Sequence, residues 1–147
     1  MKKKIILLLS VFIIGMIVGS IGVVIYLRNT INKTDNISSL LYVADLEDRA
    51  FQAYKNEKPE IGIWALKNLA QVLERNLEIK PETRSTQIDL AMTYGRLAIK
   101  SKTIGDISGY EENVNKAISL LQQALPEDKY TKETIIDFIN KADEAKN

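Results

Sequence analysis

The side chain best suited to recognition is Trp64, the only tryptophan in the chain. Helical spacing places it among polar residues, opposite the apolar stripe of its own segment, and Asn68, Gln71 and Arg75 follow on the same side. Aromatic and arginine side chains contribute most of the binding energy at protein interfaces. We therefore predict that these four residues bind a partner protein. Two alternatives are that a neighbouring segment covers the indole, or that it rests at a membrane–water interface.

A second unusual position is Glu47, which falls in the middle of an apolar helical face. A carboxylate in such a place must be paired or hydrogen-bonded, because burial otherwise raises its pKa. Arg84 and Lys102 share one angular position on a later helix. We expect Glu47 to form a buried structural ion pair with these cations.

Residue types exclude much of the common chemistry. The chain contains neither cysteine nor histidine, so thiol chemistry, the usual proton shuttle and the commonest metal ligand are missing. It also lacks a glycine-rich phosphate loop, an HExxH motif and a nucleophile elbow. We expect no catalytic activity, cofactor or metal site. From Arg28 onward lysine and arginine are not clustered, so no nucleic-acid partner is expected.

The apolar stretch 5–27 carries no charge, and it determines where all these residues lie relative to a membrane. A helix rises about 1.5 Å per residue and the hydrocarbon core is about 30 Å thick, so this stretch is long enough to span a bilayer. Lys2, Lys3 and Lys4 precede it, and an excess of cations marks the cytoplasmic side. The prediction is a single-pass signal-anchor in a cell inner or plasma membrane, with a cytoplasmic N-terminus and a periplasmic domain.

Two alternatives to this topology remain open. The first is a cleaved signal peptide ending near Ser20, Ile21 and Gly22, although the apolar run exceeds the usual length of such a segment. The second is a cytoplasmic domain.

Glycines form one face of the predicted membrane helix. Gly15, Gly19 and Gly22 recur at helical spacing, and small residues let two helices approach closely in lipid. This face could pair with a second copy of the chain or with another membrane protein. The alternative is that glycine is simply common in membrane helices.

Beyond a polar stalk at 28–37, residues 38–147 show helical periodicity throughout. Five antiparallel helices are expected, and no strand. Pro59 and Pro81 should open the second and third helices, since proline is favoured at the first helical position. A capping box at Ser108–Glu111 should open the fourth and Thr131 the fifth, whose end from residue 141 should fray. The third helix has the widest apolar arc and should be central.

Two helices share a pattern: Ala65-Leu66, Leu69 and Val72-Leu73 match Ala117-Ile118, Leu121 and Ala124-Leu125. With Leu90-Ala91 and Tyr94 ahead of it and Pro126 behind it, the second unit resembles a tetratricopeptide repeat. The resemblance implies a two-layer helical array whose groove binds a peptide or protein surface. A simple five-helix bundle would explain the same alanines. The predicted function is a bacterial-type membrane-anchored adaptor or scaffold, and the alternative is an accessory subunit assembled through its membrane helix.

Overall fold

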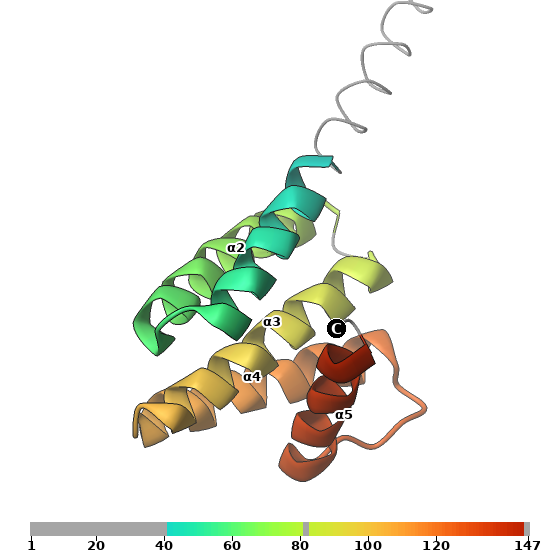
Figure 1. Ribbon diagram of the computed structural model, residues 1–147. Coiled ribbons are helices and arrows are strands. Elements are labelled where there is room, and N and C mark those ends of the chain that lie inside the picture. Colours follow the sequence, from blue (N-terminus) through green and yellow to red (C-terminus); the bar gives the residue numbers. More distant parts are fainter. Residues whose placement is uncertain (1–40, 81–82, 146–147) are drawn as a thin grey trace, which may run out of the picture. The chain divides into compact units, whose positions relative to one another are not determined.

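The structure is a computed structural model that describes residues 41–80 and 83–145. These residues form an all-α fold without strands: a helix over 41–56, α2 (Pro59–Ile79), α3 (Arg84–Thr103), α4 (Ile107–Ala124) and α5 (Lys132–Ala145) (Figure 1). The predicted fold class is confirmed for this part of the chain. From Val43 onward these residues belong to one compact unit.

The predicted membrane anchor, its glycine face, the stalk and residues 38–40 all lie outside the described residues. None of the described helices combines the length and the apolar character needed to cross a bilayer.

The third helix lies at the centre of the unit, as its wide apolar arc predicts. α3 packs against α2, α4 and α5, while the helix over 41–56 lies beside α2 (Figure 1). Because α3 has neighbours on several sides, eight of its residues are buried: Leu90, Ala91, Thr93, Tyr94, Gly95, Leu97, Ala98 and Ser101. Leucines from α2 and α4 and isoleucines from α5 complete the core around it.

The start of α2 follows the prediction and the start of α3 does not. Pro59 occupies the first turn of α2, where its missing N–H costs no hydrogen bond. α3 begins at Arg84 rather than at Pro81, with Thr83 as its N-cap. The Thr83 N–H and hydroxyl both donate to the Lys80 carbonyl oxygen, at 3.3 and 3.1 Å, and the helix begins after Thr83.

The predicted capping box at Ser108 is wrong, because α4 begins at Ile107 with Asp106 as its N-cap. Gly105 adopts φ 78°, a left-handed conformation that glycine tolerates and that ends α3. The Asp106 carboxylate then accepts a hydrogen bond of 2.8 Å from the Gly109 N–H. Asp106 and Ser108 are both suitable N-cap residues. The left-handed turn at Gly105 places Asp106 at the N-cap position.

The start of α5 is confirmed and its predicted fraying is wrong. Thr131 caps the helix by accepting from the Thr134 N–H at 3.3 Å. The helix then continues to Ala145 without fraying in the described residues. Asp143, near this end, is 3% exposed and forms an ion pair with Arg96 of α3. This contact fixes the last turn of α5 against the centre of the unit.

A glycine allows α5 to approach α3 closely. A Cβ atom at Gly95 would lie 1.8 Å from Cδ1 of Ile139, so the isoleucine side chain occupies the space that any larger residue would need. Ile139 is buried. Phe138, the preceding residue, is 46% exposed, because the contact with α3 is centred on Ile135 and Ile139.

Candidate functional site

Trp64 lies on the outer face of α2, where the sequence predicted it. Its exposed fraction is 68%, a high value for the largest apolar side chain. Gln71 and Arg75 are exposed and Asn68 is half-buried. The spacing of the four along α2 places them on one side of the helix, which we call the Trp64 face. The structure therefore brings all four predicted binding residues together.

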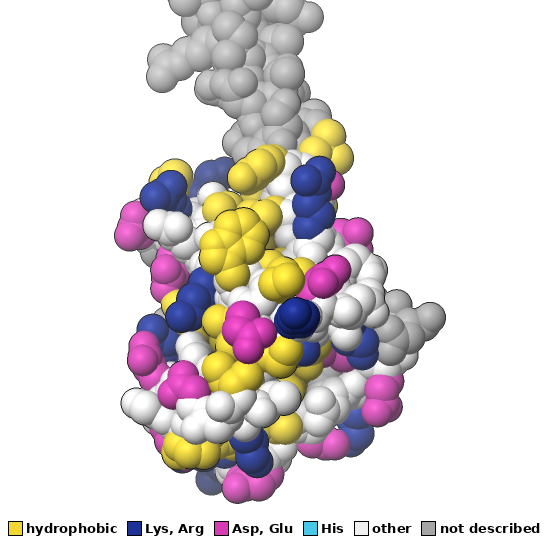
Figure 2. Space-filling view, turned by 60° about the vertical axis from the view of Figure 1, so that its left-hand side comes forward, with side chains coloured by type: hydrophobic (Ala, Val, Ile, Leu, Met, Phe, Trp, Pro, Cys, Tyr) yellow, Lys and Arg dark blue, Asp and Glu magenta, His cyan; other side chains and the backbone are white. Residues whose placement is uncertain are grey.

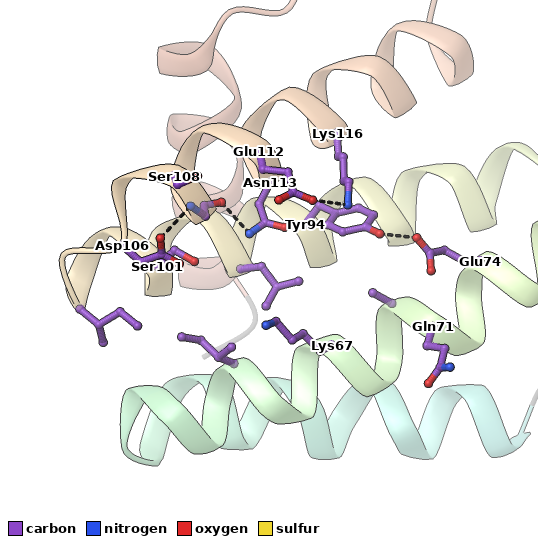
Figure 3. Close-up of a pocket in the computed structure, with 15 residues that line it drawn as sticks. Lys67, Gln71, Glu74, Tyr94, Ser101, Asp106, Ser108, Glu112, Asn113 and Lys116 are labelled. Carbon is purple, nitrogen blue, oxygen red and sulfur yellow. Dashed lines mark hydrogen bonds and ion pairs between the residues drawn. The ribbon is translucent and has the colours of Figure 1, made fainter.

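A groove runs beside this face, between α2 and α4, and α3 forms its floor (Figure 3). Its volume is about 490 Å³. The α2 wall includes Ile63, Lys67 and Glu74, and Gln71 belongs both to this wall and to the Trp64 face. The resemblance to helical repeats implied a groove, but no pattern in the sequence identified the residues that line it.

A row of polar side chains crosses one end of the groove from α2 to α4 (Figure 3). The Tyr94 hydroxyl, on the floor, donates to the Glu74 carboxylate. The Lys116 ammonium lies 5.0 Å from the centroid of the Tyr94 ring and 2.7 Å from the Glu112 carboxylate. Burial first, then the hydrogen bond to Glu74 and the charges of Glu74 and Glu112, raise the pKa of Tyr94 well above its usual value. This end of the groove therefore brings two carboxylates and one ammonium together around the Tyr94 ring.

The opposite end of the groove carries both apolar and polar side chains, and the polar ones are Ser101, Asp106 and Ser108 (Figure 3). Leu97 lies at the floor, while Ile63 and Ile104 line the sides. Ile104 is 46% exposed, and the nearby Ile107 is more exposed still. Hydrophobic side chains gather in the middle of the face shown in Figure 2, with charged side chains on both sides of them. Such exposed apolar surface with a charged surround is typical of interaction sites.

A buried cluster on another side of α3 was missed by the sequence analysis. The Arg96 guanidinium pairs with Asp143 through Nε at 3.0 Å and Nη2 at 2.5 Å, and it lies 5.0 Å from the Phe51 ring centroid. One Asp143 oxygen, Oδ2, is buried without a hydrogen-bond partner within 3.5 Å. Burial and the nearby Asp143 charge raise the pKa of Tyr54 to about 12. These contacts join the helix over 41–56, α3 and α5, which indicates a structural role.

The predicted ion pair of Glu47 can include at most one of its two proposed cations. Arg84 and Lys102 are both exposed and lie near opposite ends of α3, roughly 27 Å apart along its axis, so one carboxylate cannot pair with both. The Lys102 ammonium lies 5.3 Å from the Tyr110 ring centroid. Glu47 is half-buried and lines a small cavity together with Arg96. A helical wheel gives the angular position of Arg84 and Lys102 but not their separation along the helix axis.

Among the described residues, no group of three acidic, histidine or cysteine side chains is arranged to hold a metal ion. No family model, curated protein or solved structure matches the chain. The Trp64 face and the groove beside it are therefore the features of the molecule that bear on its function.

Proposed function

We propose that the chain is a membrane-anchored adaptor whose helical unit binds a partner protein through the Trp64 face and the adjoining groove. The observation that carries this proposal is the 68% exposure of Trp64 beside a groove bordered by α2 and α4. Gln71 lines the groove and shares a helix face with Trp64, so one partner segment can contact both.

The exposed indole can supply much of the binding energy. Aromatic side chains of this kind bury about 150–250 Å² at an interface. At about 25 cal/mol per Å², covering roughly 150 Å² of Trp64 gives about 4 kcal/mol. That value is in the range of an interface hot spot. Arg75, four residues beyond Gln71, can add a charged contact at the rim, where such contacts govern association rate and specificity.

The predicted anchor over 5–27 contributes in a different way. Attachment to a membrane confines the helical unit to the region beside the bilayer, which raises its effective concentration for partners held there. The finer fold assignment, stacked hairpins similar to tetratricopeptide repeats with α5 as a cap, belongs to the same proposal. It is supported by the pattern that α2 and α4 share and by their positions beside α3.

The test is photo-crosslinking in intact cells with a photoreactive residue at position 64. A matched control carries it at Asn115, which is exposed on α4 and does not line the groove. A second probe at Gly19 reports on the predicted membrane helix. Adducts are identified by mass spectrometry.

We expect one heterologous protein at position 64 and a weak or absent adduct at position 115. If position 64 yields no specific adduct while position 19 captures another protein, the adaptor proposal is wrong. In that case the chain would be an accessory subunit assembled through its membrane helix.

A further inference from the structure

We infer that the groove binds the ammonium group of a partner lysine at the side-chain oxygens of Ser101 and Asp106. This inference rests on the proposed function, because it specifies one side chain that the partner protein must carry. It follows from a buried hydroxyl and a carboxylate oxygen that accept no hydrogen bond from the described residues.

The first observation is a buried hydroxyl group without a hydrogen bond. Ser101 of α3 is 4% exposed and lines the groove (Figure 3). Its Oγ makes no hydrogen bond to any other residue in the described ranges. The oxygen is not fully enclosed, so a ligand in the groove can reach it. Because a buried polar group without a partner costs free energy, a ligand that pairs with this hydroxyl gains more than it would on an open surface.

The second observation is a carboxylate oxygen beside this hydroxyl. Oδ1 of Asp106 accepts the N-cap hydrogen bond from the Gly109 N–H, whereas Oδ2 has no hydrogen-bond partner within the described part of the chain. A Cβ atom on Gly109 would lie 2.1 Å from Asp106 Oδ2 and 3.0 Å from Ser101 Oγ. The two oxygens are therefore at most about 5 Å apart. One nitrogen can donate to both, since each N–H···O bond spans about 2.9 Å.

The pattern of acceptors fits an ammonium group better than a guanidinium group. An ammonium has three N–H donors and no acceptor, so it can donate to Ser101 Oγ, to Asp106 Oδ2 and to one further oxygen. Asn113, which donates its Nδ2 to the Gly109 carbonyl oxygen at 2.7 Å, has an Oδ1 that can accept. A guanidinium prefers both oxygens of one carboxylate, and the N-cap bond already occupies Oδ1 of Asp106.

The charges in the groove also favour a cation. Three carboxylates line it, and two of them, Asp106 and Glu74, form no ion pair with the described residues. Lys116 pairs with the third, Glu112, at 2.7 Å, and Lys67 is the one other cation among the described residues that line the groove. A bound lysine would make the numbers of positive and negative groups equal.

Apolar side chains beside these oxygens can cover the methylene stem of a lysine. Ile104, which is 46% exposed, and Ile63 line the same end of the groove. Lysine commonly packs its stem on apolar surface while its charged group stays in polar surroundings. The amino group of a chain terminus has no such stem. Trp64 follows Ile63 in α2, so the partner segment that carries the lysine can also contact the Trp64 face.

The experiment selects random dodecapeptides displayed on phage against the full-length chain in lipid nanodiscs. Enriched sequences are synthesised with an acetylated N-terminus and a fluorescent label, and dissociation constants are measured by anisotropy. Each lysine is then replaced in turn by acetyl-lysine, which keeps the stem and removes the charge.

The peptides are compared on the unchanged chain, Ser101→Ala, Asp106→Asn and Trp64→Ala. Asparagine is as good an N-cap as aspartate, so Asp106→Asn removes the charge and retains the cap. Two controls change exposed residues that do not line the groove: Ser85→Ala on α3 matches the serine variant, and Glu78→Gln on α2 matches the acidic one.

We expect the enriched peptides to contain one lysine whose acetylation weakens binding to the unchanged chain about tenfold. Affinity for the unmodified peptide should fall about tenfold in Ser101→Ala, about fivefold in Asp106→Asn and also in Trp64→Ala, but in neither control. Acetylation should have little further effect in the double variant Ser101→Ala, Asp106→Asn, because both changes remove the same contacts.

Three results would overturn this inference and leave the proposed function standing. They are Trp64-dependent peptides that bind equally well when every lysine is acetylated, that contain arginine but no lysine, or that bind Ser101→Ala and Asp106→Asn as tightly as the unchanged chain. Peptides that bind Trp64→Ala as well as the unchanged chain, or a failure to enrich any sequence, would count against both.

Discussion

The close contact between Gly95 and Ile139 makes a quantitative prediction about the packing of α5. In Gly95→Ala the new methyl group would start 1.8 Å from Cδ1 and 3.2 Å from Cγ1 of Ile139, and 3.8 Å from Cγ2 of Ile135. Both isoleucines are 1% exposed or less, so neither has free space into which to rotate. Overpacking of this kind costs about 1–3 kcal/mol. Replacing glycine by alanine within a helix regains about 1 kcal/mol. An approach of 1.8 Å is at the severe end of that range, so we expect a cost of about 3 kcal/mol and a net loss of about 2 kcal/mol in the free energy of unfolding.

The assay is urea unfolding of the full-length chain in detergent, followed by circular dichroism at 222 nm. Asn115→Ala, on an exposed position of α4, is the control for helix propensity, and it should not destabilise the fold. Ile139→Val alone should cost about 1 kcal/mol, because it removes a buried methyl group.

The double variant Gly95→Ala, Ile139→Val distinguishes a specific clash from a general disturbance. Valine lacks Cδ1, the atom that the alanine would strike, so the two effects should not add. We expect the double variant to be more stable than the sum of the single losses predicts, by about 1 kcal/mol. Additive losses, or a Gly95→Ala variant as stable as the unchanged chain, would show that α5 does not pack on α3 in this way.

Three further predictions concern the buried ion pair, the cap of α4 and a buried phenol. Asp143→Ala leaves the Arg96 charge unpaired in a buried site and should cost about 3 kcal/mol in the same unfolding assay, while adding Arg96→Met should recover part of the loss. Asp106→Ala should cost about 1 kcal/mol whereas Ser108→Ala should be nearly neutral, and the reverse order would favour the capping box predicted from the sequence. Tyr54 titrates near pH 10 when unfolded and near 12 when folded, so the folded state holds this proton more tightly. Its contribution to stability is complete below about pH 10 and is lost as the pH rises to about 12, and Tyr54→Phe should show a smaller decline over that interval.

The sequence predicted the helices well, because apolar spacing and local caps determine them. Pro59 and Thr131 open α2 and α5 as expected, since both signals act within one turn of the chain. The error at α4 came from two adjacent candidate caps, Asp106 and Ser108. The choice between them depends on the left-handed turn at Gly105, which a single sequence does not specify.

Contacts between helices were predicted less well. The Trp64 face could be inferred, since it depends only on the position of residues around one helix. The partner of Arg96 could not be inferred, because Asp143 lies in a terminal stretch whose charged residues look like a solvated end. The residues that line the groove could not be inferred either, because Glu74, Tyr94 and Lys116 lie on three different helices and come together only in the folded structure. Angular position on one helix shows which residues point inward, but not which residue of another helix they meet.

The exposure of the only tryptophan has a spectroscopic consequence. An indole that is 68% exposed already emits from a largely aqueous environment, so unfolding should change its emission wavelength little. A partner that covers it replaces water with protein, which should shift the emission to the blue and protect the indole from quenching by iodide. The fluorescence of Trp64 can therefore report binding without a label. Its emission wavelength should shift when a partner covers the Trp64 face and should change little when the protein unfolds.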